Sequence, residues 1–196
     1  MRHAKFALAF IFPFLLASCS KSSSPQPTSL QITVINSVGN PVIGASVTLY
    51  SSQTDLLNNT NALGSSTSDS KGMVTFSNLS AIQYYWLAQD GCENNVNSSV
   101  TSQTPLTANI NNTVTSTLSG TGTLKFVNTS ANPYHVYVNG VLSGDISGGQ
   151  SGDEYYAPIG NYTIRVVQIS GYAVTPTDES FTGTLSCGSS LTTTFP

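Results

Sequence analysis

Charged side chains are scarce in this chain of 196 residues: Asp, Glu, Lys and Arg make up only 8% of it. An average soluble domain carries about a quarter. Six residues are Lys or Arg, and no stretch gathers several of them. Nucleic acids and anionic lipid surfaces are bound through clusters of such cations. The composition therefore argues against a nucleic-acid partner and against membrane binding by charge.

Histidine and cysteine are also few, with two and three copies. His135 is the one histidine beyond the N-terminal segment, and no cysteine or histidine spacing matches a zinc site. The sequence also has no Gly-x-Ser-x-Gly motif, which would supply a serine nucleophile to pair with His135. Asp145, Asp153 and Glu154 flank a predicted Gly/Ser loop at 144–153, but without the ligand spacing of a calcium loop. We therefore predict no catalytic residue, no metal site and no cofactor.

The N-terminal segment has the layout of an export signal. Arg2 and Lys5 precede an apolar run at 6–16. This run is about eleven residues long, whereas a membrane-spanning helix needs roughly 20. No later stretch is apolar enough to span a membrane. The sequence thus predicts secretion of the rest of the chain.

The residues that follow, Leu16-Ala17-Ser18-Cys19, resemble the lipobox of bacterial lipoproteins. The resemblance implies a signal peptide at 1–18 and a diacylglycerol and palmitate-type anchor on Cys19. The Ser/Pro-rich composition that follows, which has no periodicity, predicts a flexible tether, so that residues 19–28 hold the lipidated cysteine and the tether. Ser20 after the cysteine favours the outer membrane of a Gram-negative envelope. The alternative is an ordinary secretory signal with an incidental cysteine.

Beyond the tether, short runs of alternating apolar and polar residues lie between Gly, Asn, Asp and Pro turns. Leu30, Ile32 and Val34 form one such run, and Ala45, Val47 and Leu49 form another. No window shows sustained helical periodicity. This pattern is typical of an all-β fold made of sandwiches.

Two segments of residues 29–118 point to a family. Asn40-Pro41-Val42-Ile43-Gly44-Ala45-Ser46-Val47-Thr48-Leu49-Tyr50 and Asp69-Ser70-Lys71-Gly72-Met73-Val74-Thr75-Phe76-Ser77-Asn78-Leu79 resemble the signatures of carboxypeptidase regulatory-like and Cna-B-like domains. The resemblance implies a prealbumin-like, or transthyretin-like, β-sandwich. Such modules are general scaffolds, so it implies little about function.

Residues 119–196 read as a second sandwich. Asn139-Gly140 between two alternating runs is a strong signal for a type I′ hairpin. The hairpin, Pro158-x-Gly160-x-Tyr162 before a strand, and Gly171-Tyr172 together resemble a PEGA-type domain. That resemblance implies a module of extracytoplasmic proteins.

Cys92 and Cys187 fall one in each proposed module. Export permits a disulfide, which would close a loop of about 95 residues. Two separate thiols are the alternative, and both stay open at this point.

Neighbouring aromatic residues suggest where a ligand could bind. Tyr84, Tyr85 and Trp86 share one strand, and Tyr155 and Tyr156 are adjacent in the second module. Exposed rings of this kind form binding faces in β-sandwiches, whereas buried ones fill the core. Alternation places Tyr84 and Trp86 on one face of the strand and Tyr85 on the other, and one of these faces must pack in the core. We take Tyr84, Tyr85 and Trp86 as a candidate aromatic binding face, with core packing as the alternative.

We expect a lipid-anchored, non-enzymatic binding or adhesion accessory of the cell envelope that contacts glycan or protein. One alternative is a structural spacer or assembly component without a small ligand. A weaker one is an envelope hydrolase, which would require a cleft gathering His135 and two carboxylates.

Overall fold

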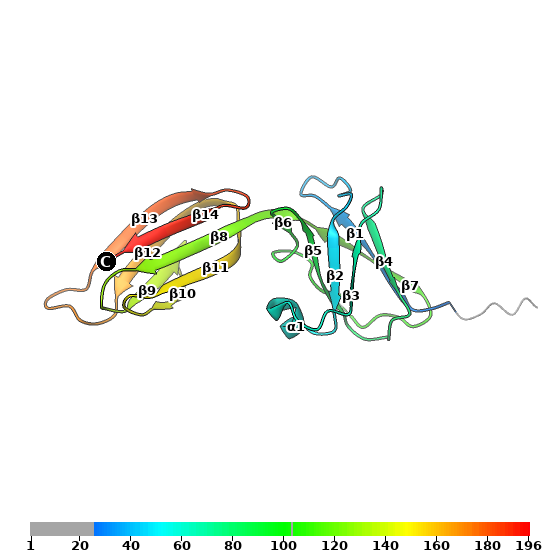
Figure 1. Cartoon of the computed structure of the whole chain (residues 1–196), viewed down its shortest axis with the longest axis horizontal. Coiled ribbons are helices and arrows are strands. Elements are labelled where there is room, and N and C mark those ends of the chain that lie inside the picture. Colours follow the sequence, from blue (N-terminus) through cyan, green and yellow to red (C-terminus); the bar gives the residue numbers. More distant parts are fainter. Residues whose placement is uncertain (1–25, 103) are drawn as a thin grey trace, which may run out of the picture.

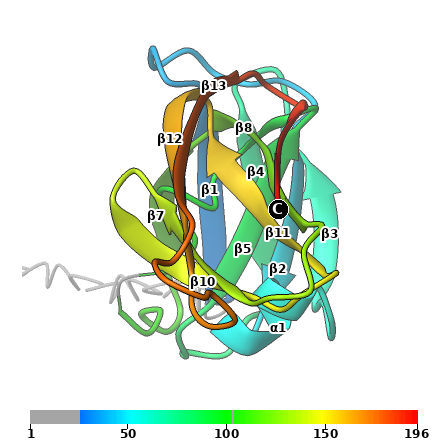
Figure 2. The same ribbon diagram turned by 90° about the vertical axis from the view of Figure 1, so that its left-hand side faces the viewer.

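The computed structural model describes residues 26–102 and 104–196. These residues form fourteen strands and one short helix, arranged as two β units placed end to end (Figure 1). The predicted all-β class is confirmed. The signal peptide, Cys19 and the tether up to residue 25 lie outside the described residues. Figure 2 looks along the long axis with the second unit in front.

The first unit is a sandwich of two sheets. One sheet has the order β4-β1-β7, in which β1 runs antiparallel to β4 and parallel to β7. The facing sheet has the order β3-β2-β5-β6. The strands are β1 (Ser29–Ile35), β2 (Ser46–Tyr50), β3 (Gly64–Thr67), β4 (Met73–Ser77), β5 (Tyr85–Asp90), β6 (Glu93–Asn94) and β7 (Asn111–Thr117).

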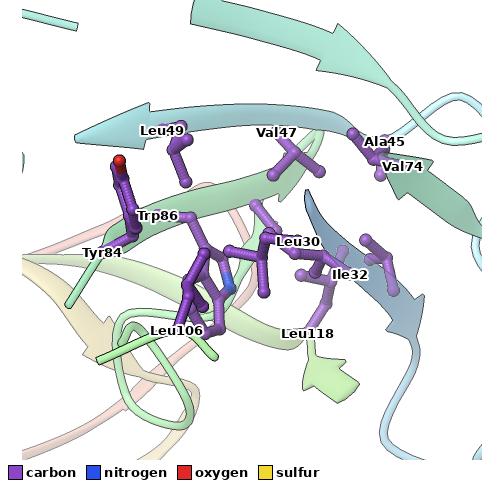
Figure 3. Close-up of a cluster of buried hydrophobic side chains, with 12 residues drawn as sticks. Leu30, Ile32, Ala45, Val47, Leu49, Val74, Tyr84, Trp86, Leu106 and Leu118 are labelled. Atoms are coloured by element: carbon purple, nitrogen blue, oxygen red, sulfur yellow. The ribbon is translucent and has the colours of Figure 1, made fainter. Parts of the chain in front are cut away.

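Alternation along the strands supplies the core between these sheets. Leu30 and Ile32 of β1 face Val47 and Leu49 of β2, as their spacing predicts. Trp86 extends from β5 into the space between the sheets (Figure 3). The core includes Leu30, Ile32, Val34, Ala45, Val47, Leu49, Val74, Tyr84, Trp86, Ala88, Leu106 and Leu118.

The second unit is also a sandwich. One sheet has the order β10-β9-β12-β13, and the other is formed by β8 with β11 and β14 on its two sides. A separate core of Leu124, Phe126, Tyr134, Val136, Ala157, Tyr162, Ile164, Val166, Leu185 and Phe195 lies between them. The strands are β8 (Ser119–Asn128), β9 (Tyr134–Val138), β10 (Val141–Ile146), β11 (Ser151–Pro158), β12 (Gly160–Gln168), β13 (Asp178–Leu185) and β14 (Ser190–Phe195).

One strand, β8, belongs to both units. Its first residues, Ser119 and Gly120, pair with β6, and the rest pairs with β11 and β14. The second sheet of each unit is therefore part of one continuous sheet. Hydrogen bonds of the backbone, and not only a linker, join the two sandwiches.

Two local expectations have different outcomes. The hairpin at Asn139-Gly140 is confirmed, because both residues have positive φ and connect β9 directly to β10. The loop expected at 144–153 is wrong. Most of it belongs to β10 and β11, and the turn is confined to residues 147–150. Backbone pairing with β9 and β8 outweighs the weak strand preference of Gly and Ser here.

Candidate binding site at the junction of the units

The three aromatic residues proposed as a binding face do not form one. Trp86 is fully buried, and its indole N–H donates to Ser116 Oγ at 3.0 Å inside the first core. Tyr84 is buried on the same face, as their spacing requires. Only Tyr85, on the opposite face, is partly exposed. Trp86 and Tyr84 are core residues, so this candidate site is wrong.

Cys92 and Cys187 form a disulfide with an S–S distance of 2.03 Å. Cys92 lies between β5 and β6 of the first unit, and Cys187 between β13 and β14 of the second. Of the two alternatives left open by the sequence, the structure contains the bridge. The disulfide is thus a covalent link across the junction, in addition to the shared strand.

Polar side chains add further links at the same place. The Asn94 amide donates to Thr121 Oγ1 at 2.7 Å, and Thr121 N and Oγ1 both donate to the carbonyl of Cys92. Asn94 and Thr121 are buried, so this network is shielded from competing water. On the other side of the disulfide, Gly188 N donates to Thr121 O at 2.8 Å. The junction is therefore fixed by backbone pairing, a disulfide and buried hydrogen bonds together.

A β-bulge in β11 presents two tyrosines at this junction. Between the pairs Glu154–Leu124 and Ala157–Gly122, β11 advances by three residues while β8 advances by two. The extra residue breaks the alternation, and Tyr155 and Tyr156 are both exposed, by 66% and 42%. Tyr156 has a φ of 59°, in the left-handed region, where a bulky side chain is an outlier. Its carbonyl accepts from Asn97 Nδ2 of the first unit at 2.9 Å.

The helix α1 (Gln53–Asn58) forms the opposite wall from the first unit. Ser52 caps it by accepting from Asp55 N, and Asn59 ends it with a left-handed backbone. Leu56 is buried, whereas Leu57 is exposed. The Tyr50 hydroxyl donates to Asn59 Oδ1 at 2.7 Å. Burial raises the pKa of Tyr50, and Tyr156 across the junction adds to this rise.

These elements enclose a cleft of about 460 Å³ between the units. Its lining is mainly apolar and carries no charged side chain: Leu56, Leu57, Asn59, Leu87, Val96, Tyr155 and Tyr156. The same two tyrosines also line a smaller groove of about 230 Å³ beside the disulfide, whose lining mixes polar and apolar atoms and includes Gln89, Thr123 and Ser189. Tyr155 and Tyr156 thus line both a mainly apolar cleft and a groove of mixed polarity.

The residues considered for catalysis and metal binding do not line the cleft, although Asp153 accepts from the Tyr155 hydroxyl at 3.0 Å. His135 Nδ1 pairs with Asp145 on the exposed surface of β9 and β10, and Asp153 and Glu154 lie on β11. Across residues 26–102 and 104–196, no three or more His, Cys, Asp or Glu side chains are close enough to hold a metal ion. No helix within that same part of the chain is long and apolar enough to cross a membrane.

The sequence pointed to the tyrosine pair of this site but not to the bulge or to α1. The Tyr155-Tyr156 pair stood out, but two successive outward tyrosines in a strand require a bulge that alternation does not predict. The helix α1 has six residues, too few for a periodic pattern. The four-residue pattern Ser52-x-x-Asp55 resembles a capping signal and could have located the start of α1.

Comparisons with known proteins give only distant likenesses. No protein-family model matches the chain, and no curated protein matches it. Among solved structures, a streptococcal ancillary pilin shares 10% identity at a TM-score of 0.40, over 88% of this chain and 63% of the pilin. The minor pilin GBS52 of Streptococcus agalactiae shares 18% identity at a TM-score of 0.34, over 86% and 94%. The shaft pilin SpaA of Lactobacillus rhamnosus GG shares 10% identity at a TM-score of 0.35, and the match covers 86% of this chain and 98% of that pilin.

A further match is the Bacillus anthracis TIE protein, with 17% identity and a TM-score of 0.31. This chain spans about a third of the length of that protein, with 34% of it covered. All four TM-scores are below 0.5.

Proposed function

We propose that this protein is a non-enzymatic, adhesion-type component of the cell envelope, in which two sandwiches form one stiff unit that contacts envelope glycan or protein. The fixed junction carries the proposal. A continuous sheet, the Cys92–Cys187 disulfide and a buried hydrogen-bond network all oppose rotation of one sandwich against the other. Modules joined by a flexible linker alone need none of these contacts.

The proposal includes the lipobox interpretation of the N-terminal segment. Cys19 then carries the lipid, and residues 19–28 tether the sandwiches to the outer membrane. The assignments to prealbumin-like and PEGA-like families belong to the same proposal. They agree with an extracytoplasmic location, in which the disulfide is stable.

Membrane attachment can be tested with Cys19→Ala in the full chain. The wild type is expected in the detergent-extracted membrane fraction with an intact mass that includes fatty acid and lacks residues 1–18. The variant is expected as unprocessed chain without added acyl mass. Ser20→Ala, which keeps the lipobox cysteine, is the matched control. Acyl-free wild type, or unchanged processing of the variant, contradicts lipidation.

Stiffness of the junction can be tested by distances between spin labels. Val38 and Val174 are highly exposed, one in each unit, so Val38→Cys and Val174→Cys accept labels without disturbing the cores. We expect one narrow distance distribution in the full chain. Adding Cys92→Ser and Cys187→Ser should broaden it. A broad distribution with the disulfide intact contradicts the proposal.

A structural spacer is the second candidate, favoured by the burial of Trp86 and Tyr84. A spacer needs stiffness but no ligand. The two candidates therefore share the outcome of the distance measurement. They differ in whether the full chain retains envelope glycans or proteins in a pull-down and on a glycan array.

A further inference from the structure

The cleft at the junction has the size and walls of a ligand site. Its volume of about 460 Å³ lies within the usual range for pockets that bind small groups, roughly 300–1,000 Å³. Leu56, Leu57 and Leu87 come from the first unit, and Tyr155 and Tyr156 from the second. Because the junction is fixed, these walls are already in place before a ligand arrives.

The bulge gives an independent reason to assign a role to this surface. Tyr156 adopts a left-handed backbone conformation that favours Gly or Asn, and its ring is still partly exposed. A ring that mainly stabilised the fold would be buried, and the strain would be offset by packing. Here the strained backbone turns a ring toward the cleft instead. Bulges often redirect side chains in this way beside binding sites.

The lining decides which chemistry fits. No charged residue faces the cleft, so a charged ligand would lose its hydration without gaining a partner. The hydroxyl groups of a saccharide could find partners only at Asn59, Tyr155 and Tyr156. The other four lining residues, Leu56, Leu57, Leu87 and Val96, have side chains without hydrogen-bonding groups. An apolar side chain, by contrast, gains from burial there.

The adjoining groove supplies what a peptide backbone needs. Gln89, Thr123 and Ser189 place amide and hydroxyl groups along it, and it shares Tyr155 and Tyr156 with the cleft. A bound segment could therefore bury one side chain in the cleft and make backbone hydrogen bonds in the groove. Tyrosines in such a central position are typical of protein-binding surfaces.

We propose that the junction binds an uncharged segment of a partner protein, with an aromatic or aliphatic side chain in the cleft between α1 and the β11 bulge. This inference rests on the proposed function and names its partner class. Tyr155 and Tyr156 make the contacts from the second unit, and Leu57, Leu87 and Val96 make them from the first.

The test is a titration of the full chain in lipid nanodiscs, observed through the methyl groups of leucine and valine by NMR. N-acetyl-phenylalaninamide serves as the peptide probe and N-acetylglucosamine as the saccharide probe. We expect the peptide probe to shift the methyl signals of Leu57, Leu87 and Val96, and the saccharide to leave them unchanged. Empty nanodiscs correct for partitioning of the probe into lipid.

Tyr156→Gly removes the ring and suits the backbone, so binding should weaken at least tenfold while the unfolding temperature rises. Tyr156→Asn should behave in the same way. Tyr172→Gly is the matched control, because Tyr172 is exposed to a similar degree, 47%, in the loop between β12 and β13 at the far end of the second unit (Figure 1). This control should bind within twofold of the wild type.

Three results would overturn the proposal: saccharide shifts at the same methyl groups, unchanged affinity of Tyr156→Gly, or peptide shifts of equal size at exposed Val38 and Val174. A lower unfolding temperature of Tyr156→Gly would assign the ring a structural role instead. The spin-label distances do not depend on the probes. A negative titration would therefore refute the binding site at the cleft without refuting the stiff junction.

Discussion

Removal of the disulfide by Cys92→Ser and Cys187→Ser should lower stability by several kcal/mol. The two cysteines are 95 residues apart, and closing a loop of that length restricts the unfolded chain by about 4.7 kcal/mol. If only one unit unfolds, the disulfide closes a shorter loop, but the expected loss of stability is still several kcal/mol. When only the second unit unfolds, Cys92 stays near Gly120, and a loop of about 67 residues gives about 4.4 kcal/mol. When only the first unit unfolds, a loop of about 28 residues gives about 3.6 kcal/mol.

Urea unfolding of the full chain in nanodiscs measures this loss. Trp86 is the single tryptophan of the chain and lies in the first core, so its fluorescence reports the first unit, whereas circular dichroism reports both. With a slope of about 2 kcal/mol per molar urea, the midpoint should fall by about 2 M. Wild type treated with reductant should match the double variant. A fall of less than about 0.5 M, or about 1 kcal/mol, would refute the loop-closure reasoning.

Three smaller predictions follow from single side chains. Asp69 accepts from the backbone N–H groups of Met73 and Lys71, and these hydrogen bonds lower the pKa of Asp69. The stabilisation of the fold by ionised Asp69 should therefore be complete above about pH 4 and lost as pH falls further. Urea midpoints measured against pH should show this loss in the wild type and a flatter dependence in Asp69→Asn. Asn95 is fully buried and bonds to Ala88 N and two carbonyls, so Asn95→Ala should cost about 3 kcal/mol by the same unfolding assay. Tyr156→Gly should stabilise the protein by about 1 kcal/mol, read as a higher melting temperature by calorimetry.

Strand alternation and turn chemistry carry most of the predictable part of the fold. Leu30, Ile32 and Val34 all face the core because β1 has one buried face with a strict period of two. Asn139 and Gly140 form the predicted turn because few other residue pairs accept two positive φ values. These are local preferences, so a single sequence reveals them.

The candidate site depends on contacts that no local pattern encodes. The N–H of buried Trp86 is satisfied by Ser116, which lies thirty residues later on the facing sheet. Alternation could place Trp86 and Tyr84 on one face, but it could not say which face was covered. The bulge at Tyr155 and Tyr156 depends likewise on pairing with β8. The cleft exists only where α1 and β11 meet, which requires both units to be folded and joined.

The parallel pairing of β1 with β7 determines how the protein resists pulling. β7 leads directly into β8, and β1 runs beside β7 from Ser29–Asn111 to Ile35–Thr117. A force that draws the start of β1 away from the second unit slides these two strands along each other. All the hydrogen bonds between them then share the load and must break together, unlike a hairpin that opens one bond at a time. We therefore expect the β1–β7 pair to resist a force applied between the start of the first sandwich and the second unit.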